Sequence, residues 1–177
     1  MAKTILITGA SSGIGASSAK LFLSRGWNVG LIARREDKLA IIANDHGNSL
    51  CVKCDVCQEN QVKNAFQLMV DHFGAVDVLF NNAGIFTPQA RIDQIDINDW
   101  QKSIDVNLTG MFLAAREAFR HMTKSGGRII NNGSISAHTP REGSAPYTTT
   151  KHAITGLTKT IALDGRDLNI CCGQIDI

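Results

Sequence analysis

The sequence predicts an α/β fold, in which a doubly wound parallel sheet of about six strands carries helices on both faces. Three observations support this fold class. Short apolar runs alternate along the chain with longer amphipathic stretches. A glycine-rich turn at residues 8–15 follows the first apolar run and opens the first helical stretch. The 177 residues are enough to bury one sizeable core.

Six apolar runs have the length and composition of strands. They are Ile5–Ile7, Trp27–Ala33, Ser49–Cys54, Val76–Phe80, Arg128–Asn132 and a sixth that starts with Leu168–Cys172. Because helical stretches separate these runs, they are expected to form βαβ units with right-handed crossovers, which places the strands parallel to one another.

Five stretches between the strands carry apolar residues at helical spacing. They run from Ala16 to Gly26, Arg35 to Asn44, Gln58 to Phe73, Trp100 to Lys124 and Pro146 to Leu163. Gly47 is expected to cap the second of these helices. No internal repeat, low-complexity tract or linker divides the chain, so residues 1–177 are predicted to form a single Rossmann-like domain.

Composition narrows the classes of partner. The formal net charge is +2 and is spread along the chain, which argues against a nucleic-acid surface. No run approaches eighteen apolar residues, so no membrane span is expected. The N-terminal residues enter a strand at once and lack a signal-peptide pattern, so a cytoplasmic location is expected.

The cysteines are interpreted as free thiols. Cys51, Cys54 and Cys57 have a spacing that a metal site can use, but a structural zinc site needs four ligands, and no fourth is clustered nearby. Cys51 and Cys54 also lie at an odd offset in a predicted strand, so they should point to opposite faces of the sheet. The prediction is that the chain holds no metal.

The glycine-rich turn, Thr8-Gly-Ala-Ser-Ser-Gly-Ile-Gly15, has the composition of a phosphate-binding loop. Glycines there permit a tight turn and a close approach of the backbone to a pyrophosphate. The helix that follows offers free N–H groups and the positive end of its dipole. Dinucleotide binding is therefore predicted ahead of the alternative, a tight βα turn without a ligand.

Two arginines follow the second predicted strand. Arg34 lies nineteen residues after Gly15, and Arg35 is next. An arginine at this point accommodates a ribose 2′-phosphate, which favours NADP over NAD. The alternative is that both are solvated loop charges. Glu36 and Asp37 fit better as acids in the first turn of the next helix.

Tyr147 and Lys151 are four residues apart in a helix that Pro146 can open. Positions i and i+4 share a helix face, so the ammonium can lie near the phenol. A nearby cation lowers the pKa of a tyrosine, and a tyrosine tuned in this way can exchange a proton near neutral pH.

These features resemble the short-chain dehydrogenase/reductase family, in its compact-subunit branch, along essentially the whole chain. The residues that match its motifs are Thr8, Gly9, Gly13 and Gly15 in the glycine motif, Asp55 after the third strand, Asn81-Asn82-Ala83-Gly84 after the fourth, Asn107, Ser134, Tyr147 and Lys151. Ser134 is chosen over Ser136 because the family's serine lies thirteen residues before its tyrosine.

The resemblance implies a binding site for NADP or NAD. The implied cofactor-binding residues are Gly9, Ser11, Ser12, Gly13, Ile14, Gly15, Arg34, Arg35, Asp55, Val56, Asn82, Ala83, Gly84, Tyr147, Lys151, Gly173 and Ile175. The implied catalytic residues are Tyr147 as general acid and base, Lys151 as its partner, Ser134 on the substrate oxygen, and Asn107 in a proton relay. Asn107 has two further interpretations, a satisfied core amide and a local helix kink.

The implied activity is reversible hydride transfer between NADP(H) or NAD(H) and a small-molecule carbonyl or secondary alcohol, in a homodimer or homotetramer. The alternatives are a non-catalytic nucleotide-binding or interaction module, and an isomerase or dehydratase of the same fold. His138, Arg141 and Glu142 lie between Ser134 and Tyr147 and are interpreted as solvated loop residues.

Two departures from the family stand out at the C-terminal end. Cys172 replaces the family's proline, and Ile177 replaces a threonine that contacts the nicotinamide amide, which leaves backbone near Ile175 to serve. The family also continues beyond this point with a substrate-covering loop and a last strand. The expectation is a truncated subunit whose sixth strand has an unpaired edge.

Overall fold

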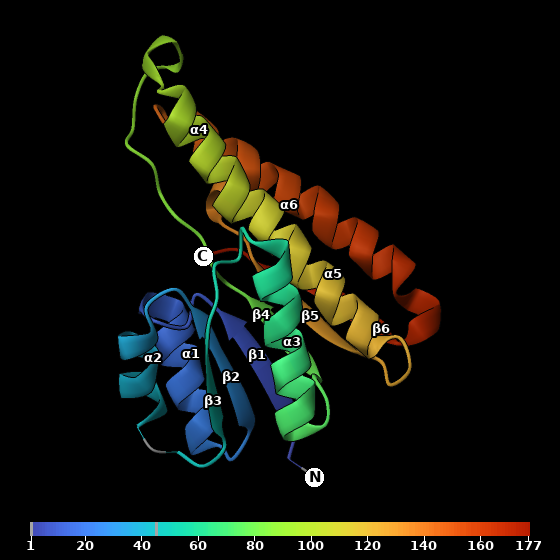
Figure 1. Ribbon diagram of the computed structural model, residues 1–177. Coiled ribbons are helices and arrows are strands. Elements are labelled where there is room, and N and C mark those ends of the chain that lie inside the picture. Colours follow the sequence, from blue (N-terminus) through green and yellow to red (C-terminus); the bar gives the residue numbers. More distant parts are fainter. Residues whose placement is uncertain (1, 45) are drawn as a thin grey trace.

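The computed structural model describes residues 2–44 and 46–177, which form one parallel sheet flanked by helices (Figure 1). The strands are β1 (Thr4–Thr8), β2 (Asn28–Ala33), β3 (Ser49–Lys53), β4 (Val78–Asn81), β5 (Gly127–Asn132) and β6 (Ile170–Ile175). Their order is β3-β2-β1-β4-β5-β6, and every neighbouring pair is parallel. The predicted fold class is confirmed.

The sheet reverses its winding between β1 and β4. Ile5 pairs with Val29 of β2 on one side and with Val78 of β4 on the other. The connections that leave β1 and β4 therefore diverge at their carboxyl ends. In open α/β sheets this switch point is where ligands bind.

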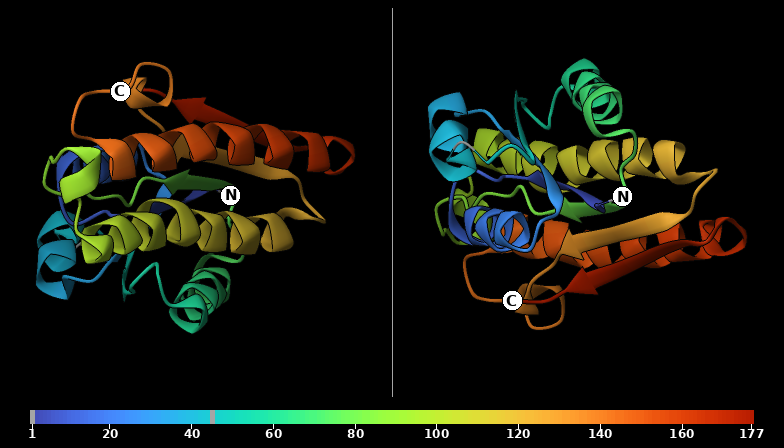
Figure 2. Two further views of the ribbon diagram at one scale, coloured as in Figure 1. Left: turned by 90° about the horizontal axis from the view of Figure 1, so that it is seen from above. Right: turned by 90° about the horizontal axis from the view of Figure 1, so that it is seen from below.

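Helices cover both faces of the sheet. Two pack on one face, α1 (Gly13–Ser24) and α2 (Glu36–Ala43), and three on the other, α3 (Glu59–Phe73), α5 (Gly110–Met122) and α6 (Ala145–Asp164). Ile5 and Ile7 of β1 belong to the first core, and Leu6 belongs to the second, as the alternation of side chains along a strand requires. Figure 2 shows α5 and α6 lying along the second face.

The predicted helix Trp100–Lys124 begins three residues earlier, at Ile97, and is interrupted by a π-helical turn. Helix α4 (Ile97–Ile104) begins where the Asp96 carboxylate accepts a 2.7 Å hydrogen bond from the Asn98 N–H. A π-helical turn, η2 (Asp105–Thr109), then joins α4 to α5, and Asn107 lies within it. Short π turns of this kind often occur at functional sites.

Two predicted boundaries are wrong. Gly47 does not cap α2. Asn44 does so, in the left-handed conformation with φ 41°, and its N–H donates to the Ala40 carbonyl oxygen, because asparagine tolerates this region better than most residues. The sixth strand begins at Ile170 and not at Leu168, since Arg166–Leu168 form a short 3₁₀ turn, η4, that ends at Asn169, also left-handed.

The cysteines are free thiols, as predicted. Cys54 belongs to the core beneath α3, and Cys51 packs against the opposite core beneath α1 and α2, which confirms the prediction of opposite faces. Across residues 2–44 and 46–177, no group of three His, Cys, Asp or Glu side chains is arranged to hold a metal ion. Within the same residues, each helix is too short or too polar to cross a bilayer.

Candidate active site

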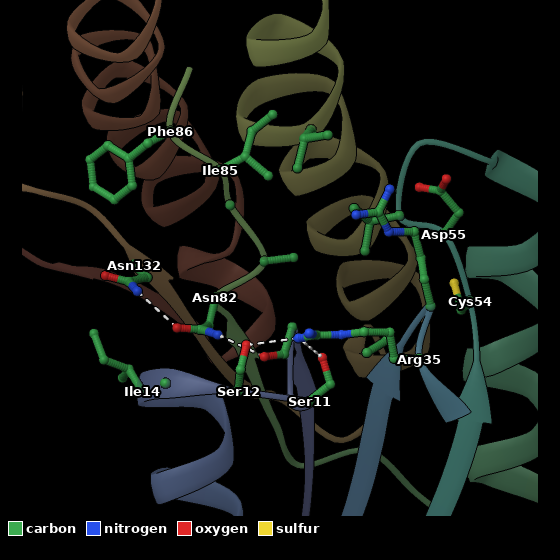
Figure 3. A pocket seen from close by; sticks show the side chains of 18 of the residues that line it. Ser11, Ser12, Ile14, Arg35, Cys54, Asp55, Asn82, Ile85, Phe86 and Asn132 are labelled. Atoms are coloured by element: carbon green, nitrogen blue, oxygen red, sulfur yellow. Dashed lines mark hydrogen bonds between the residues drawn. The ribbon is translucent and has the colours of Figure 1, made fainter. Parts of the chain in front are cut away.

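A cleft of about 670 Å³ opens at the carboxyl edge of the sheet (Figure 3). Its walls come from the ends of β1 to β5, the start of α1, the segment after β4, and α6. The lining residues are Gly9, Ser11, Ser12, Gly13, Ile14, Ala33, Arg34, Arg35, Cys54, Asp55, Val56, Asn82, Ala83, Gly84, Ile85, Phe86, Val106, Asn132, Gly133, Tyr147, Lys151 and Ile177. Most of the cofactor-binding residues predicted from the sequence are therefore brought together here.

The glycine-rich turn packs tightly against the end of β4. Gly9 has φ +67°, and a Cβ at this residue would lie 2.9 Å from the Ala83 Cα. A Cβ on Gly15 would collide with the Gly9 carbonyl oxygen, so Gly15 supports the turn from beneath the cleft lining. The Thr8 hydroxyl accepts hydrogen bonds from the N–H groups of Asn82 and Ala83 at 2.9 and 3.0 Å. Only glycine fits both positions without moving the backbone.

One end of the cleft is suited to an anion. The N-terminus of α1 points its unpaired N–H groups and the positive end of its dipole toward this end. Arg35 donates from Nη2 to the hydroxyl oxygens of Ser11 and Ser12, at 2.9 and 3.0 Å. Figure 3 shows this guanidinium reaching across to the two serines, with Asp55 at the same end. A helix terminus, two hydroxyls and a guanidinium thus converge.

Arg34 and Asp55 also line this end of the cleft. The Asp55 carboxylate accepts a 3.0 Å hydrogen bond from the Cys57 N–H, which holds the chain in a turn after β3. Burial, followed by the charge of Asp55, raises the pKa of the Cys57 thiol to about 11, although Arg34 acts to lower it. Cys57 is therefore a neutral thiol near pH 7.

Tyr147 and Lys151 line the cleft from α6. Pro146 lies in the first turn of this helix, as predicted. The Lys151 Nζ is 5.4 Å from the centroid of the Tyr147 ring, which confirms that the two side chains share a face. Lys151 is only 4% exposed, and burial lowers its pKa to about 8, against the attraction of Asp176. A buried ammonium thus lies beside a phenol.

Asn132, the last residue of β5, links Lys151 to the glycine-rich turn. Its carbonyl oxygen accepts a 2.7 Å hydrogen bond from Lys151, and its side-chain amide donates to the Asn82 Oδ1 at 2.8 Å. The Asn82 amide in turn donates to the Thr8 carbonyl oxygen at 3.0 Å. Sequence reasoning missed Asn132, although its place at a strand end two residues before Ser134 was an available signal.

Asn107 lies behind the cleft and is fully buried. Its Oδ1 accepts from the Ile85 N–H at 2.7 Å, and its Nδ2 donates to the Ile85 carbonyl oxygen at 3.0 Å, with Ser103 and Thr150 also within reach. The interpretation of Asn107 as a satisfied core amide is confirmed, and the residue lies within the π-helical turn η2. Its role in a proton relay stays a prediction.

Ser134 is 5% exposed and lies directly behind the lining, between Gly133 and the 3₁₀ turn η3 (Ile135–Ala137). Its Oγ accepts from the Ser136 N–H at 3.1 Å and donates to the Ile177 carbonyl oxygen at 3.4 Å. The hydroxyl therefore has hydrogen-bond partners within the chain. Gly133, which precedes Ser134, and Ile177, which accepts its hydrogen bond, both line the cleft.

Gly173 and Ile175 are not brought into the cleft. They lie within β6, in register with Ile130 and Asn132 of β5. The lining residue from this part of the chain is Ile177. Strand β6 extends to Ile175, three residues beyond the run Leu168–Cys172 from which the strand was predicted. Both residues are therefore part of the hydrogen-bonded pairing between β5 and β6.

Phe86 is a second lining residue that sequence reasoning missed. It is 76% exposed, yet its ring stacks on that of Tyr147, with centroids 4.3 Å apart and planes inclined by 22°. Figure 3 shows it at the end of the cleft that also holds Asn132, away from Arg35. An aromatic residue two positions after the Asn81–Gly84 motif was the available signal.

Comparisons with known proteins agree with this geometry. The protein-family model described as short chain dehydrogenase matches residues 3–176 of this chain. The chain is 34% identical to a 3beta-hydroxysteroid dehydrogenase of Mediterraneibacter gnavus, over 98% of this chain and 64% of that protein. It is 38% identical to the mitochondrial borneol dehydrogenase of Lavandula x intermedia, over 96% of this chain and 67% of that protein.

A solved structure is also similar in fold. The 3-ketoacyl-(acyl-carrier-protein) reductase of Brucella melitensis, complexed with NADH, superposes with a TM-score of 0.94 and 29% identity, over 98% of this chain and 74% of that chain. The chain thus spans roughly two thirds to three quarters of the length of these relatives. Because the family model matches residues 3–176, nearly the whole chain, the chain belongs to the short-chain dehydrogenase family.

Proposed function

We propose that the cleft binds a nicotinamide dinucleotide and that the chain transfers a hydride between it and a small-molecule carbonyl or secondary alcohol. The observation that carries this proposal is the position of the buried Lys151 beside Tyr147, in the cleft whose far end is suited to an anion. When bound, the nicotinamide supplies and accepts the hydride, and the protein orients and polarises the reactants.

The residues of the cleft fit such a cofactor. Gly9 and Gly15 lack the Cβ atoms that would fill the turn, so backbone N–H groups at the start of α1 can approach a pyrophosphate. Arg35, which is held by Ser11 and Ser12, is proposed to bind a 2′-phosphate, and its position at this end of the cleft supports the proposed preference for NADP over NAD. Asp55 is proposed to contact the adenine.

The chemistry is proposed to centre on the Tyr147 phenol, which gives a proton in carbonyl reduction and takes one in alcohol oxidation. The Lys151 ammonium lies 5.4 Å from the centroid of this ring and is shielded from water, and it is proposed to assist the proton transfer. Ser134 is proposed to hold the substrate oxygen as charge develops, and Asn107 to support proton relay from behind the cleft.

An apolar, ring-bearing secondary alcohol or its ketone is the substrate class that we favour. Phe86 presents an exposed aromatic face beside Tyr147. Two relatives are named for a 3beta-hydroxysteroid and for borneol, which are both ring alcohols. An aromatic wall next to the proton donor suits such a ring, since apolar surface buried against it favours binding.

We also propose that residues 1–177 act as one domain and assemble as a homo-oligomer through α5 and α6. These helices carry apolar side chains that are exposed in the single chain, among them Phe112 at 43% and Leu163 at 62%. Light scattering of the purified chain should give twice or four times the monomer mass of 19.1 kDa. A monomer at micromolar concentration would contradict this assembly.

The decisive experiment compares Tyr147→Phe with the unchanged chain. We expect loss of NADPH-dependent ketone reduction by a factor of about 10³ or more, with the Kd for NADPH within about twofold, because the phenol hydroxyl is needed for proton transfer. Thr149→Ala, an exposed position on the same helix turn, is the matched control.

Other outcomes separate the alternatives. Full activity in Tyr147→Phe would exclude Tyr147 as the proton donor. NADPH binding without turnover on any ketone or alcohol would favour a nucleotide-binding module. Product formation without a change in nicotinamide absorbance would favour an isomerase or dehydratase.

A further inference from the structure

The Asp176 carboxylate, one residue beyond β6, accepts three hydrogen bonds. Its Oδ1 accepts from the Ser134 N–H at 2.9 Å and from the Gln174 side-chain amide at 2.6 Å. Its Oδ2 lies 2.9 Å from the His138 Nε2. Ser134 and His138 are the residues immediately before and after the 3₁₀ turn η3. One carboxylate therefore contacts both residues that flank η3, Ser134 and His138.

The fit around this carboxylate is close. A Cβ on Gly133 would collide with the Asp176 Oδ1, so only glycine lets the carboxylate approach the turn at this point. Gly133 lines the cleft, and Ser134 follows it directly. The position of Asp176 is thus coupled to the backbone at the cleft wall.

Gln174 extends the connection to the helix that carries Tyr147 and Lys151. Its amide donates to Thr155 Oγ1 at 3.1 Å, and its Oε1 accepts from Thr158 Oγ1 at 3.5 Å, both on α6. A path of side chains therefore leads from α6 through Gln174 and Asp176 to the Ser134 backbone. This path connects the Ser134 backbone to the helix that carries Tyr147.

The charge of Asp176 is consistent with this role. Partial burial acts against ionisation, but the hydrogen bonds from His138, Gln174 and the Ser134 N–H outweigh it and keep the pKa of Asp176 below its usual range. Because the His138 side chain is 60% exposed, solvent weakens the attraction between the two side chains. The contact therefore contributes chiefly to geometry and little to the stability of the whole chain.

We propose that Asp176 and His138 are positioning residues for Ser134, which hold η3 so that the Ser134 hydroxyl faces the substrate oxygen. The inference rests on the proposed hydride-transfer function. It gives His138, whose side chain is 60% exposed, a positioning role beyond that of a solvated loop residue. The position of a hydrogen-bonding group within an active site affects the rate strongly, since a displacement of about 1 Å can cost about a hundredfold.

Paired substitutions test this role in the full chain. His138→Ala and Asp176→Ala should each lower kcat by about ten- to a hundredfold, with the Kd for NADPH and the melting temperature nearly unchanged. His138→Gln keeps an N–H at the position of Nε2 and should restore most of the activity. Asp167→Ala, which removes an exposed carboxylate from η4, is the matched control.

The double variant His138→Ala/Asp176→Ala should be no slower than Asp176→Ala, because both changes remove one shared contact. A rate loss equal to the product of the two single losses would contradict a shared contact. Wild-type kcat in both alanine variants, with Tyr147→Phe inactive, would overturn this inference and leave the proposed function standing. An active Tyr147→Phe would instead overturn the proposed function.

A measurement that needs no turnover completes the test. The Ser134 amide should exchange its hydrogen at least about tenfold faster in Asp176→Ala than in the unchanged chain, because it loses its acceptor. In His138→Gln its exchange should stay close to that of the unchanged chain. Equal exchange of the Ser134 amide in Asp176→Ala and the unchanged chain would overturn the proposal whatever the activity.

Discussion

The Lys151 ammonium donates a 2.7 Å hydrogen bond to the carbonyl oxygen of Asn132. This bond joins α6, which carries the proposed proton donor Tyr147, to the end of β5. The Asn132 side chain continues the connection to Asn82 at 2.8 Å, and Asn82 holds the glycine-rich turn. The proposed chemical and cofactor-binding parts of the cleft are therefore linked by hydrogen bonds between residues that lie far apart in sequence.

Burial of Lys151 predicts an unusual dependence of stability on pH. Its pKa is about 8 in the folded chain, against an ordinary value of 10.5. Between these values the unfolded chain binds more protons at this residue, so this residue's contribution makes the free energy of unfolding rise with pH. Urea unfolding from about pH 8 to pH 10 should show this rise relative to Lys151→Met.

The comparison with Lys151→Met is needed because buried thiols act in the opposite direction. The pKa values of Cys57 and Cys172 are raised by burial from 9.0 to about 11, so their contribution falls as pH rises above 9.0. That contribution is the same in both proteins and cancels in the difference. A difference that does not change between pH 8 and pH 10 would show that Lys151 titrates normally.

Arg35→Ala should weaken NADP binding selectively. Loss of a charge-assisted contact to the 2′-phosphate is expected to raise the Kd for NADP by about ten- to a hundredfold and to leave the Kd for NAD within about twofold. Titration calorimetry with both nucleotides measures this. Lys38→Ala, an exposed cation on α2, is the control. Equal weakening of both nucleotides would exclude Arg35 as the phosphate ligand.

Asn107→Leu should destabilise the chain. The change removes the buried Asn107 amide, which bonds both the N–H and the carbonyl oxygen of the half-buried Ile85, while keeping a similar side-chain volume. We expect the free energy of unfolding to fall by about 2–4 kcal/mol. Asn64→Leu, at an exposed position of α3, should change it by less than about 0.5 kcal/mol. Equal stabilities of the two variants in urea would show that the Asn107 contacts contribute little.

Phe86→Ala should raise KM for an apolar ring ketone by about tenfold, because it removes an aromatic contact surface. The kcat should change less, since Phe86 carries no proton. Ile92→Ala, which removes an equally exposed apolar side chain further along the same segment, is the control. An unchanged KM in Phe86→Ala, measured with at least two ring ketones, would remove Phe86 from the substrate site.

Much of the fold and part of the site follow from local patterns. The alternation of apolar runs with amphipathic stretches predicted the parallel sheet, because side chains repeat every 2 residues in strands and every 3.6 in helices. The glycine-rich turn and the Tyr147–Lys151 spacing were also readable, since each lies within a few residues of the chain. Such features depend on local backbone geometry, which residues close together in the sequence determine.

Other site features have no local signal of comparable strength. Asn132 meets Asn82 and Lys151 only because β4 and β5 are adjacent and α6 packs behind them. Gly173 and Ile175 do not line the cleft, because the register between β5 and β6 pairs them with Ile130 and Asn132 within the sheet. These outcomes depend on strand order and register, which pair residues tens of positions apart.

The sequence by itself determined the fold class, the glycine-rich turn and the helix face that carries Tyr147 and Lys151, because periodicity, glycine content and i, i+4 spacing are local properties of the chain. Only the tertiary structure decided that Lys151 is buried and that Asp176 reaches Ser134 and His138. Burial and long-range hydrogen bonds arise when distant segments pack together, and no short stretch of sequence encodes them.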